Sequence, residues 1–134
     1  MIKIVRTGAR VFLGLVYFVF GGMGLGIVFG LIKMPEQPMS DAAKAFFGGI
    51  MAAGYFFPLL KTTETVCGFL LLIGRAVPLA LVILAPVTLN IIFFHFFLTP
   101  GSREIILPVA IVLAHVLAAG GYWRVYQPLF GSEN

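Results

Sequence analysis

The sequence predicts an all-α integral membrane protein, a four-helix bundle with a short interfacial or re-entrant helix between its first and second spans. The chain has 134 residues, of which 60% are hydrophobic and only 10% are charged, whereas soluble domains carry about 25% charged residues. Its mean hydropathy is +1.07. Four spans of ~20 apolar residues would occupy ~80 positions and leave only short connections. We therefore interpret residues 1–134 as a single membrane domain.

The first span is predicted over residues 11–32, which carry no formal charge. Lys3, Arg6 and Arg10 precede this run, as basic residues precede the apolar core of a secretory signal. The run is longer than the apolar core of a signal, however, and no cleavage site of the A-x-A kind follows it. We therefore expect an uncleaved first span.

The region after the first span is the least regular in the chain. Residues 33–44 contain two prolines and charges of both signs, which predicts a solvent-facing connection. The apolar stretch that follows is interrupted by glycines and by Pro58. We expect an interfacial or re-entrant helix over residues 42–53, a bend near Pro58, and the second span over residues 58–74. A single long, kinked helix is the alternative.

The third span is predicted over residues 76–98, an uncharged run between Arg75 and the polar segment TPGSRE. The fourth span is predicted over residues 105–123. It ends in Tyr122, Trp123 and Arg124, which is typical of the aromatic and basic belt at a membrane interface.

Basic residues predict the orientation of the spans. With both termini in the cytoplasm, the cytoplasmic side carries Lys3, Arg6, Arg10, Arg75 and Arg124, and the far side carries Lys33, Lys44 and Arg103. This bias follows the positive-inside rule. Because these residues flank apolar runs instead of clustering on a solvated face, the net charge of +4 indicates a lipid bilayer as the partner and no nucleic acid.

Small residues spaced four apart predict close contacts between membrane helices. They are Gly22, Gly26 and Gly30 in the first span, and Ala110, Ala114 and Ala118 in the fourth. These stripes either hold the four spans of one chain together or form the face of a homo-oligomer.

Ionisable residues within the spans are costly and need an explanation. Lys61 and Glu64 lie three residues apart on one face of the second span, so they can pair. Lys61 can also extend towards the headgroups, which leaves Glu64 as the residue that most needs a role. The helical rise predicts that Asn90 and Glu64 lie at similar depths, ~12 and ~10 Å from the outer ends of their spans. His95 is predicted nearer the outer surface.

The candidate ligand-binding residues are Lys61, Glu64, Asn90, His95 and His115, the last near the centre of the fourth span. Such a cluster can line an outward-facing polar cavity in which Glu64 exchanges a proton, a histidine titrates and Asn90 orients a carbonyl. A quinone headgroup would suit it, with phenylalanines around the tail. The alternative is hydrogen bonding that only fixes the bundle. No metal-ligand spacing and no catalytic motif is present.

One segment combines a bend at Gly54, Tyr55 and Pro58 with Lys61, Glu64, Gly68, the run LLLIGR, Pro78, Asn90 and His95. Together with the opening ARVFLGLVYFVFGGMG and the tail YWRVYQPLF, it resembles the DoxX family of small four-span membrane proteins. The resemblance implies a location in the bacterial inner membrane. It also implies candidate site positions at Lys61, Glu64, Asn90 and His95.

Relatives in that family include the membrane subunit of a thiosulfate:quinone oxidoreductase, a methylamine-utilisation protein and proteins that assist receptor assembly. The resemblance therefore implies one of two functions. The first is a quinone- or small-ligand-binding subunit of a membrane oxidoreductase system, with other membrane or redox proteins as partners. The second is a non-catalytic assembly or scaffold protein that acts through helix contacts. It does not decide whether the chain is an enzyme.

Overall fold

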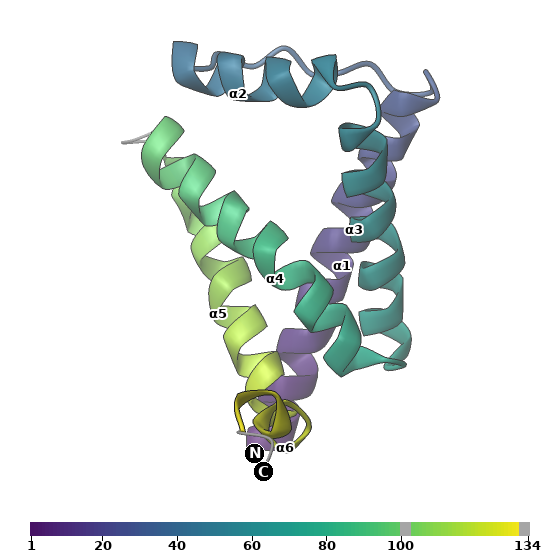
Figure 1. Cartoon of the computed structure of the whole chain (residues 1–134), viewed down its shortest axis with the longest axis vertical. Helices are drawn as coiled ribbons and strands as arrows, with labels where there is room; N and C mark the ends of the chain where they lie inside the picture. The colour runs from purple at the N-terminus through teal and green to yellow at the C-terminus, as the bar shows by residue number, and fades with distance from the viewer. Residues whose placement is uncertain (100–102, 132–134) are drawn as a thin grey trace.

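A computed structural model describes residues 1–99 and 103–131 of the chain, and these residues form helices joined by short turns and connections (Figure 1). The elements in order are α1 (Ile2–Val28), α2 (Asp41–Ala52), α3 (Phe56–Ile73), α4 (Val77–Phe93), the π-helical turn η1 (Phe94–Leu98), the 3-10 turn η2 (Arg103–Ile105), α5 (Ile106–Gly120), α6 (Trp123–Tyr126) and η3 (Gln127–Phe130).

Four of these helical segments are long and apolar enough to cross a membrane: α1, α3, α4 with η1, and η2 with α5. They confirm the all-α membrane fold. Large apolar side chains point outward along them, including Leu79, Leu113 and Val116, each at least 59% exposed. A bilayer is the environment that such a surface requires.

The boundaries of α3, α4 with η1, and α5 agree with the predicted spans to within three residues. The first span differs more, because α1 begins at Ile2, well before the uncharged run. It also ends before the predicted boundary, since Gly30 adopts a φ of 74°. The backbone N–H groups of Leu31 and Ile32 turn back to the carbonyl of Gly26, at 2.8 and 3.1 Å. Gly30 therefore terminates the helix.

Helix α2 is separate from α3, so the alternative of one long kinked helix is wrong. Ser40 caps α2 by accepting a hydrogen bond from the backbone of Ala43 at 3.1 Å. The chain then turns at Gly54, with a φ of 77°, before α3 begins. In Figure 1, α2 lies across the ends of the long helices, as an interfacial helix would. Ring contacts from Phe46 to Phe94 and from Phe47 to Phe57, at 5.6 and 6.0 Å, attach it to η1 and α3.

Helix α1 packs extensively against α3, and glycines make the approach possible. A Cβ atom at Gly21 would lie 2.7 Å from the backbone nitrogen of Thr65, and one at Gly68 would collide with the backbone of Phe18. A Cβ at Gly14 would lie 3.0 Å from the carbonyl oxygen of Gly68. The absence of side chains at these positions allows the two backbones to touch.

The predicted glycine stripe does not make this contact within the chain. Gly22 and Gly30 have no atom within 4 Å of a Cβ built on them, and Gly26 faces Ile32 from the turn that follows α1. A spacing of four indicates close packing but does not say which face of a helix is used. Helix α1 instead meets α3 through the helix face that carries Gly21.

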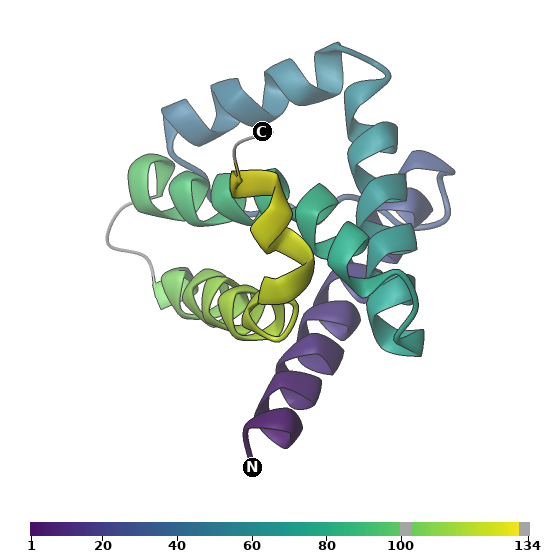
Figure 2. The same cartoon turned by 60° about the horizontal axis from the view of Figure 1, so that its bottom comes forward.

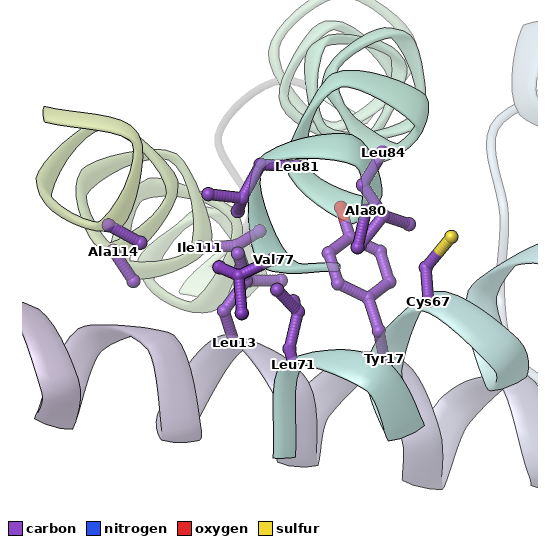
Figure 3. Packing of buried hydrophobic residues seen from close by; sticks show 11 residues of the cluster. Leu13, Tyr17, Cys67, Leu71, Val77, Ala80, Leu81, Leu84, Ile111 and Ala114 are labelled. Carbon is purple, nitrogen blue, oxygen red and sulfur yellow. The ribbon is translucent and has the colours of Figure 1, made fainter. Parts of the chain in front are cut away.

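In α5, Ala114 and Ala118 are buried in the core, and Ala110 is half-buried. Figure 3 shows this core, which brings together Leu13 and Tyr17 of α1, Cys67 and Leu71 of α3, Val77, Ala80, Leu81 and Leu84 of α4, and Ile111, Ala114 and Ala118 of α5. Each of the four spans thus contributes to one core.

The first residue of the chain and the end of the described C-terminal segment lie at the same end of the bundle (Figure 1). Figure 2 brings this end forward and shows α6 and η3 lying across it. An even number of spans requires both termini on one side of the membrane, and the arrangement agrees with that requirement.

Candidate functional site

The predicted ion pair forms within α3. The Nζ atom of Lys61 donates a hydrogen bond to Oε2 of Glu64 at 2.9 Å, with side chains that are 19% and 5% exposed. Glu64 lies about 12 Å along a helix of ~27 Å, at 1.5 Å per residue, so the carboxylate sits near the middle of the span. The ammonium also lies 5.6 Å from the centre of the Phe57 ring, within the range of a cation–π contact.

Glycines of α1 make room for this pair. A Cβ atom at Gly24 would lie 2.8 Å from Cε of Lys61, and one at Gly21 would lie 3.0 Å from Cβ of Glu64. The stem of Lys61 therefore packs directly on the backbone of α1. Sequence reasoning missed this role, because it grouped the glycines by spacing and not by what stands opposite them.

The neighbouring threonines are satisfied within α3. The hydroxyl of Thr63 donates to the carbonyl of Leu59 at 2.8 Å, and that of Thr65 donates to the carbonyl of Lys61 at 2.7 Å. Such back-bonding is common for threonine inside helices. It leaves the ion pair as the main polar feature of this face of α3.

The ion pair borders a cavity of about 440 Å³, which we call the polar cavity. Its polar lining consists of Lys61, Glu64, His95, Gln37 and Glu104 together with the hydroxyl-bearing Tyr17; its apolar lining consists of Val16, Phe20, Ile91, Leu107, Pro108 and Ile111. Each of the four spans contributes to it. The volume falls within the ~300–1,000 Å³ typical of small-molecule sites.

Three polar lining residues were not predicted: Gln37, Glu104 and Tyr17, the last in α1. Gln37 belongs to the connection before α2, and Glu104 belongs to the short turn η2 before α5. The sequence predicted Gln37 in a solvent-facing connection and Glu104 in the polar segment before the fourth span, and it indicated no role for either residue. The available signal was the carboxylate of Glu104, which stands at the start of an apolar run.

His95 reaches the polar cavity from the π-helical turn η1. π-Helical turns frequently mark functional sites. Its Nδ1 lies 2.8 Å from the carbonyl of Ile91, and because a carbonyl only accepts, Nδ1 carries the proton and donates it. In the neutral imidazole, Nε2 is then an acceptor for a ligand.

Asn90 does not reach the polar cavity, although its predicted depth matches that of Glu64. Asn90 is exposed and is not among the residues that line the cavity. Thr88, Ile91 and His95 mark the inward face of this helix at spacings of three and four, and Asn90 lies off that stripe. Depth was therefore no guide to the direction in which Asn90 points.

His115 belongs to a second polar cluster, which we call the core network. Its Nε2 lies 3.0 Å from the carbonyl of Leu81, so Nε2 donates, and in the neutral ring Nδ1 accepts from the hydroxyl of Thr88 at 2.9 Å. The Thr88 oxygen in turn accepts from the hydroxyl of Tyr17 at 2.6 Å. The network links α1, α4 and α5, and it gives His115 the bonds that a buried core histidine requires.

The polar cavity offers hydrogen-bonding and proton-exchange chemistry: one ammonium, two carboxylates, an imidazole and an amide. Among residues 1–99 and 103–131, no three His, Cys, Asp or Glu side chains are close enough to hold a metal ion. Cys67 is only 3% exposed and packs in the hydrophobic core, as a small packing residue would.

Comparison with known proteins finds no matching family model, no matching curated protein and no matching solved structure. The resemblance to the DoxX family stays a prediction from its residues.

Proposed function

We propose that this protein binds a small ligand in the polar cavity and serves as a subunit of a membrane oxidoreductase system, with a quinone as the ligand. The observation that supports this proposal is the Lys61–Glu64 pair, 2.9 Å apart at mid-span and bordering a cavity of about 440 Å³. A buried ion pair seldom stabilises a protein more than apolar side chains of similar size. Ionisable groups at this depth typically mark a functional site.

A quinone fits the chemistry of the lining. Its two carbonyl oxygens accept hydrogen bonds, and the ammonium of Lys61 and the amide of Gln37 are donors in the lining. Its apolar tail would lie among aliphatic and aromatic side chains such as Phe20 and Ile91. Reduction of a quinone to the quinol takes up two electrons and two protons. In this proposal Glu64 and His95 exchange the protons, and a partner redox protein supplies the electrons.

Mass spectrometry of small molecules retained by the purified protein tests this proposal. The native protein is compared with Glu64→Gln and with Asn90→Ala, a matched control whose side chain lies outside the polar cavity. We expect a quinone with the native protein and with Asn90→Ala, and much less with Glu64→Gln. Equal retention of quinone by a folded Glu64→Gln protein, or only bulk phospholipid in all three samples, would contradict the proposal.

The alternative function is a non-catalytic assembly or scaffold protein that acts through helix contacts. One observation favours it: Gly22 has no atom within 4 Å of its potential Cβ, so this part of α1 offers an open backbone surface to a partner helix. The scaffold function predicts that Gly22→Leu disrupts a complex with other membrane proteins while Glu64→Gln leaves it intact. A complex that survives Gly22→Leu would exclude this contact.

We further propose that the protein resides in a bacterial inner membrane with both termini in the cytoplasm. The support is the bias of basic residues, five on the side of the termini against three on the far side. Single cysteines at position 44 or 124 distinguish the two sides, because the native Cys67 is buried.

A further inference from the structure

A second polar pocket lies at the end of the bundle where the chain begins. This basic pocket has a volume of about 320 Å³ and is lined by Lys3, Arg6, Thr7 and Arg10 of α1 and by Ala118, Gly121 and Tyr122 around the end of α5. It shares no lining residue with the polar cavity. The two sites are therefore separate.

Within residues 1–99 and 103–131, no carboxylate compensates the positive charge of the basic pocket. Lys3, Arg6 and Arg10 follow one another at spacings of three and four, which places them along one face of α1. The carboxylates that the structure describes are in other places: Glu36 before α2, Asp41 in α2, Glu64 in α3 and Glu104 in η2. None of them lines this pocket. The charge therefore calls for an anion from outside the described chain.

The two arginines are held in place by the helices that meet here. One guanidinium nitrogen of Arg10, Nη1, donates to the carbonyl of Leu71 at 2.5 Å, near the end of α3. Cations are favoured at this end of a helix, and a guanidinium has five N–H donors, so others stay available. The stem of Arg6 runs along the end of α5, where a Cβ at Gly121 would lie 3.2 Å from its Cδ.

The Arg6 side chain is half-buried, yet within the described residues its guanidinium makes neither a hydrogen bond nor an ion pair. A guanidinium fixed by packing and without a protein acceptor is well suited to bind phosphate oxygens, because its planar fork matches their geometry. The hydroxyls of Thr7 and Tyr122 add further polar groups to the same pocket.

The position of the basic pocket indicates the source of the phosphate. Arg10 directly precedes the uncharged run of α1, and Tyr122 follows the end of α5, so both lie at the level of the headgroups. Exposed apolar side chains continue from the pocket along the spans, including Phe12 at 38% and Leu117 at 42%. A phosphate in the pocket would therefore leave its acyl chains against an apolar surface.

We propose that the basic pocket binds the headgroup of an anionic phospholipid, with Arg6 and Arg10 contacting the phosphate and Lys3 adding positive charge. Basic pockets between membrane helices recognise such headgroups, and each Lys or Arg strengthens the attraction. A zwitterionic headgroup brings an amine next to its phosphate, which the same three cations repel. The pocket thus distinguishes anionic from zwitterionic phospholipids.

Native mass spectrometry of the purified full-length protein with added phosphatidylglycerol or phosphatidylcholine tests this inference. We expect phosphatidylglycerol to bind at least ten-fold more tightly. Removing one charge with Arg6→Gln should weaken its binding about five-fold, and Lys3→Gln with Arg6→Gln about 25-fold. Arg10 is left intact because it also bonds to α3. The control is Arg124→Gln, which removes a charge at the same end but outside the pocket.

Four outcomes would overturn the inference. Equal binding of the two lipids would show that the pocket does not distinguish headgroups, and an unchanged affinity in the folded Arg6→Gln variant would show that the lipid binds elsewhere. Equal weakening by Arg124→Gln would reduce the effect to general surface charge. Finally, millimolar inorganic phosphate could stabilise the lipid-depleted protein as much as lipid does, and this stabilisation could be lost in Arg6→Gln. That result would identify free phosphate as the ligand.

Discussion

Removing one partner of the Lys61–Glu64 pair should destabilise the protein far more than removing both. Their charged atoms lie 2.9 Å apart and the side chains are 19% and 5% exposed. At that separation and an effective dielectric constant of ~20, the Coulomb attraction is about 6 kcal/mol. Much of it offsets the cost of taking the two charges out of water. We therefore expect Glu64→Gln, which leaves a buried ammonium unpaired, to cost about 3–5 kcal/mol.

The double variant Lys61→Met with Glu64→Leu removes both charges and keeps similar side-chain volumes. Flexible methionine can follow the path that the lysine stem takes across Gly24. Since apolar replacement of a buried pair is often neutral or stabilising by ~1–4 kcal/mol, we expect this variant to be at least as stable as the native protein. It should nevertheless lose the ligand of the polar cavity.

Thermal unfolding in a mild detergent measures the first effect, and mass spectrometry of retained ligand measures the second. We expect Glu64→Gln to be the least stable of the three proteins and the double variant to be at least as stable as the native protein. If the single variant were as stable as the native protein while the double variant lost several kcal/mol, the pair would be a structural element and not a functional one. Ligand retained by the double variant would place the binding site elsewhere.

Three other predictions concern packing, the core network and topology. Gly68→Ala should lower the free energy of unfolding by about 2 kcal/mol or more in an unfolding titration, because the new Cβ would meet the backbone of α1. Gly22→Ala, which has open space around it, should leave that free energy unchanged or raise it by up to ~1 kcal/mol. Thr88→Val should lower the free energy of unfolding by about 2–4 kcal/mol, since it leaves the Tyr17 hydroxyl and the His115 imidazole without their partner. In the same titration, Thr88→Ser, which keeps the hydroxyl, should retain most of the native stability. In intact cells, an impermeant maleimide should label Lys44→Cys and not Arg124→Cys, and the reverse pattern would contradict cytoplasmic termini.

The spans and α2 could be predicted from the sequence because their signals are local. Runs of uncharged residues set the lengths of the spans, and the short apolar stretch after the polar connection of residues 33–44 predicted α2. The Lys61–Glu64 pair was accessible for the same reason, since a spacing of three on one helix face brings side chains together. None of these inferences required knowledge of how the helices are arranged around one another.

The sequence could not predict in the same way which face of each helix points inward. A soluble helix has one apolar face, so its pattern shows which side is buried. The spans here are apolar on every side because their outer faces meet lipid. The misplacement of Asn90 and of the glycine stripe has this single cause. The partners of His115, which are Thr88 and Tyr17 on two other helices, are likewise set by the arrangement of the bundle.

The small residues of α1 connect the packing of the bundle with the polar cavity. An interface selected only for stability would place apolar side chains opposite the middle of α3, and α1 does carry such side chains elsewhere in the core. At Gly21 and Gly24 it has none; Thr65 and Glu64 lie against Gly21, and Lys61 lies against Gly24. The same stretch of α1 contributes Tyr17 and Phe20 to the cavity wall. Opposite the ion pair, the chain thus has glycines in α1 where apolar side chains would pack, and this opening borders the polar cavity.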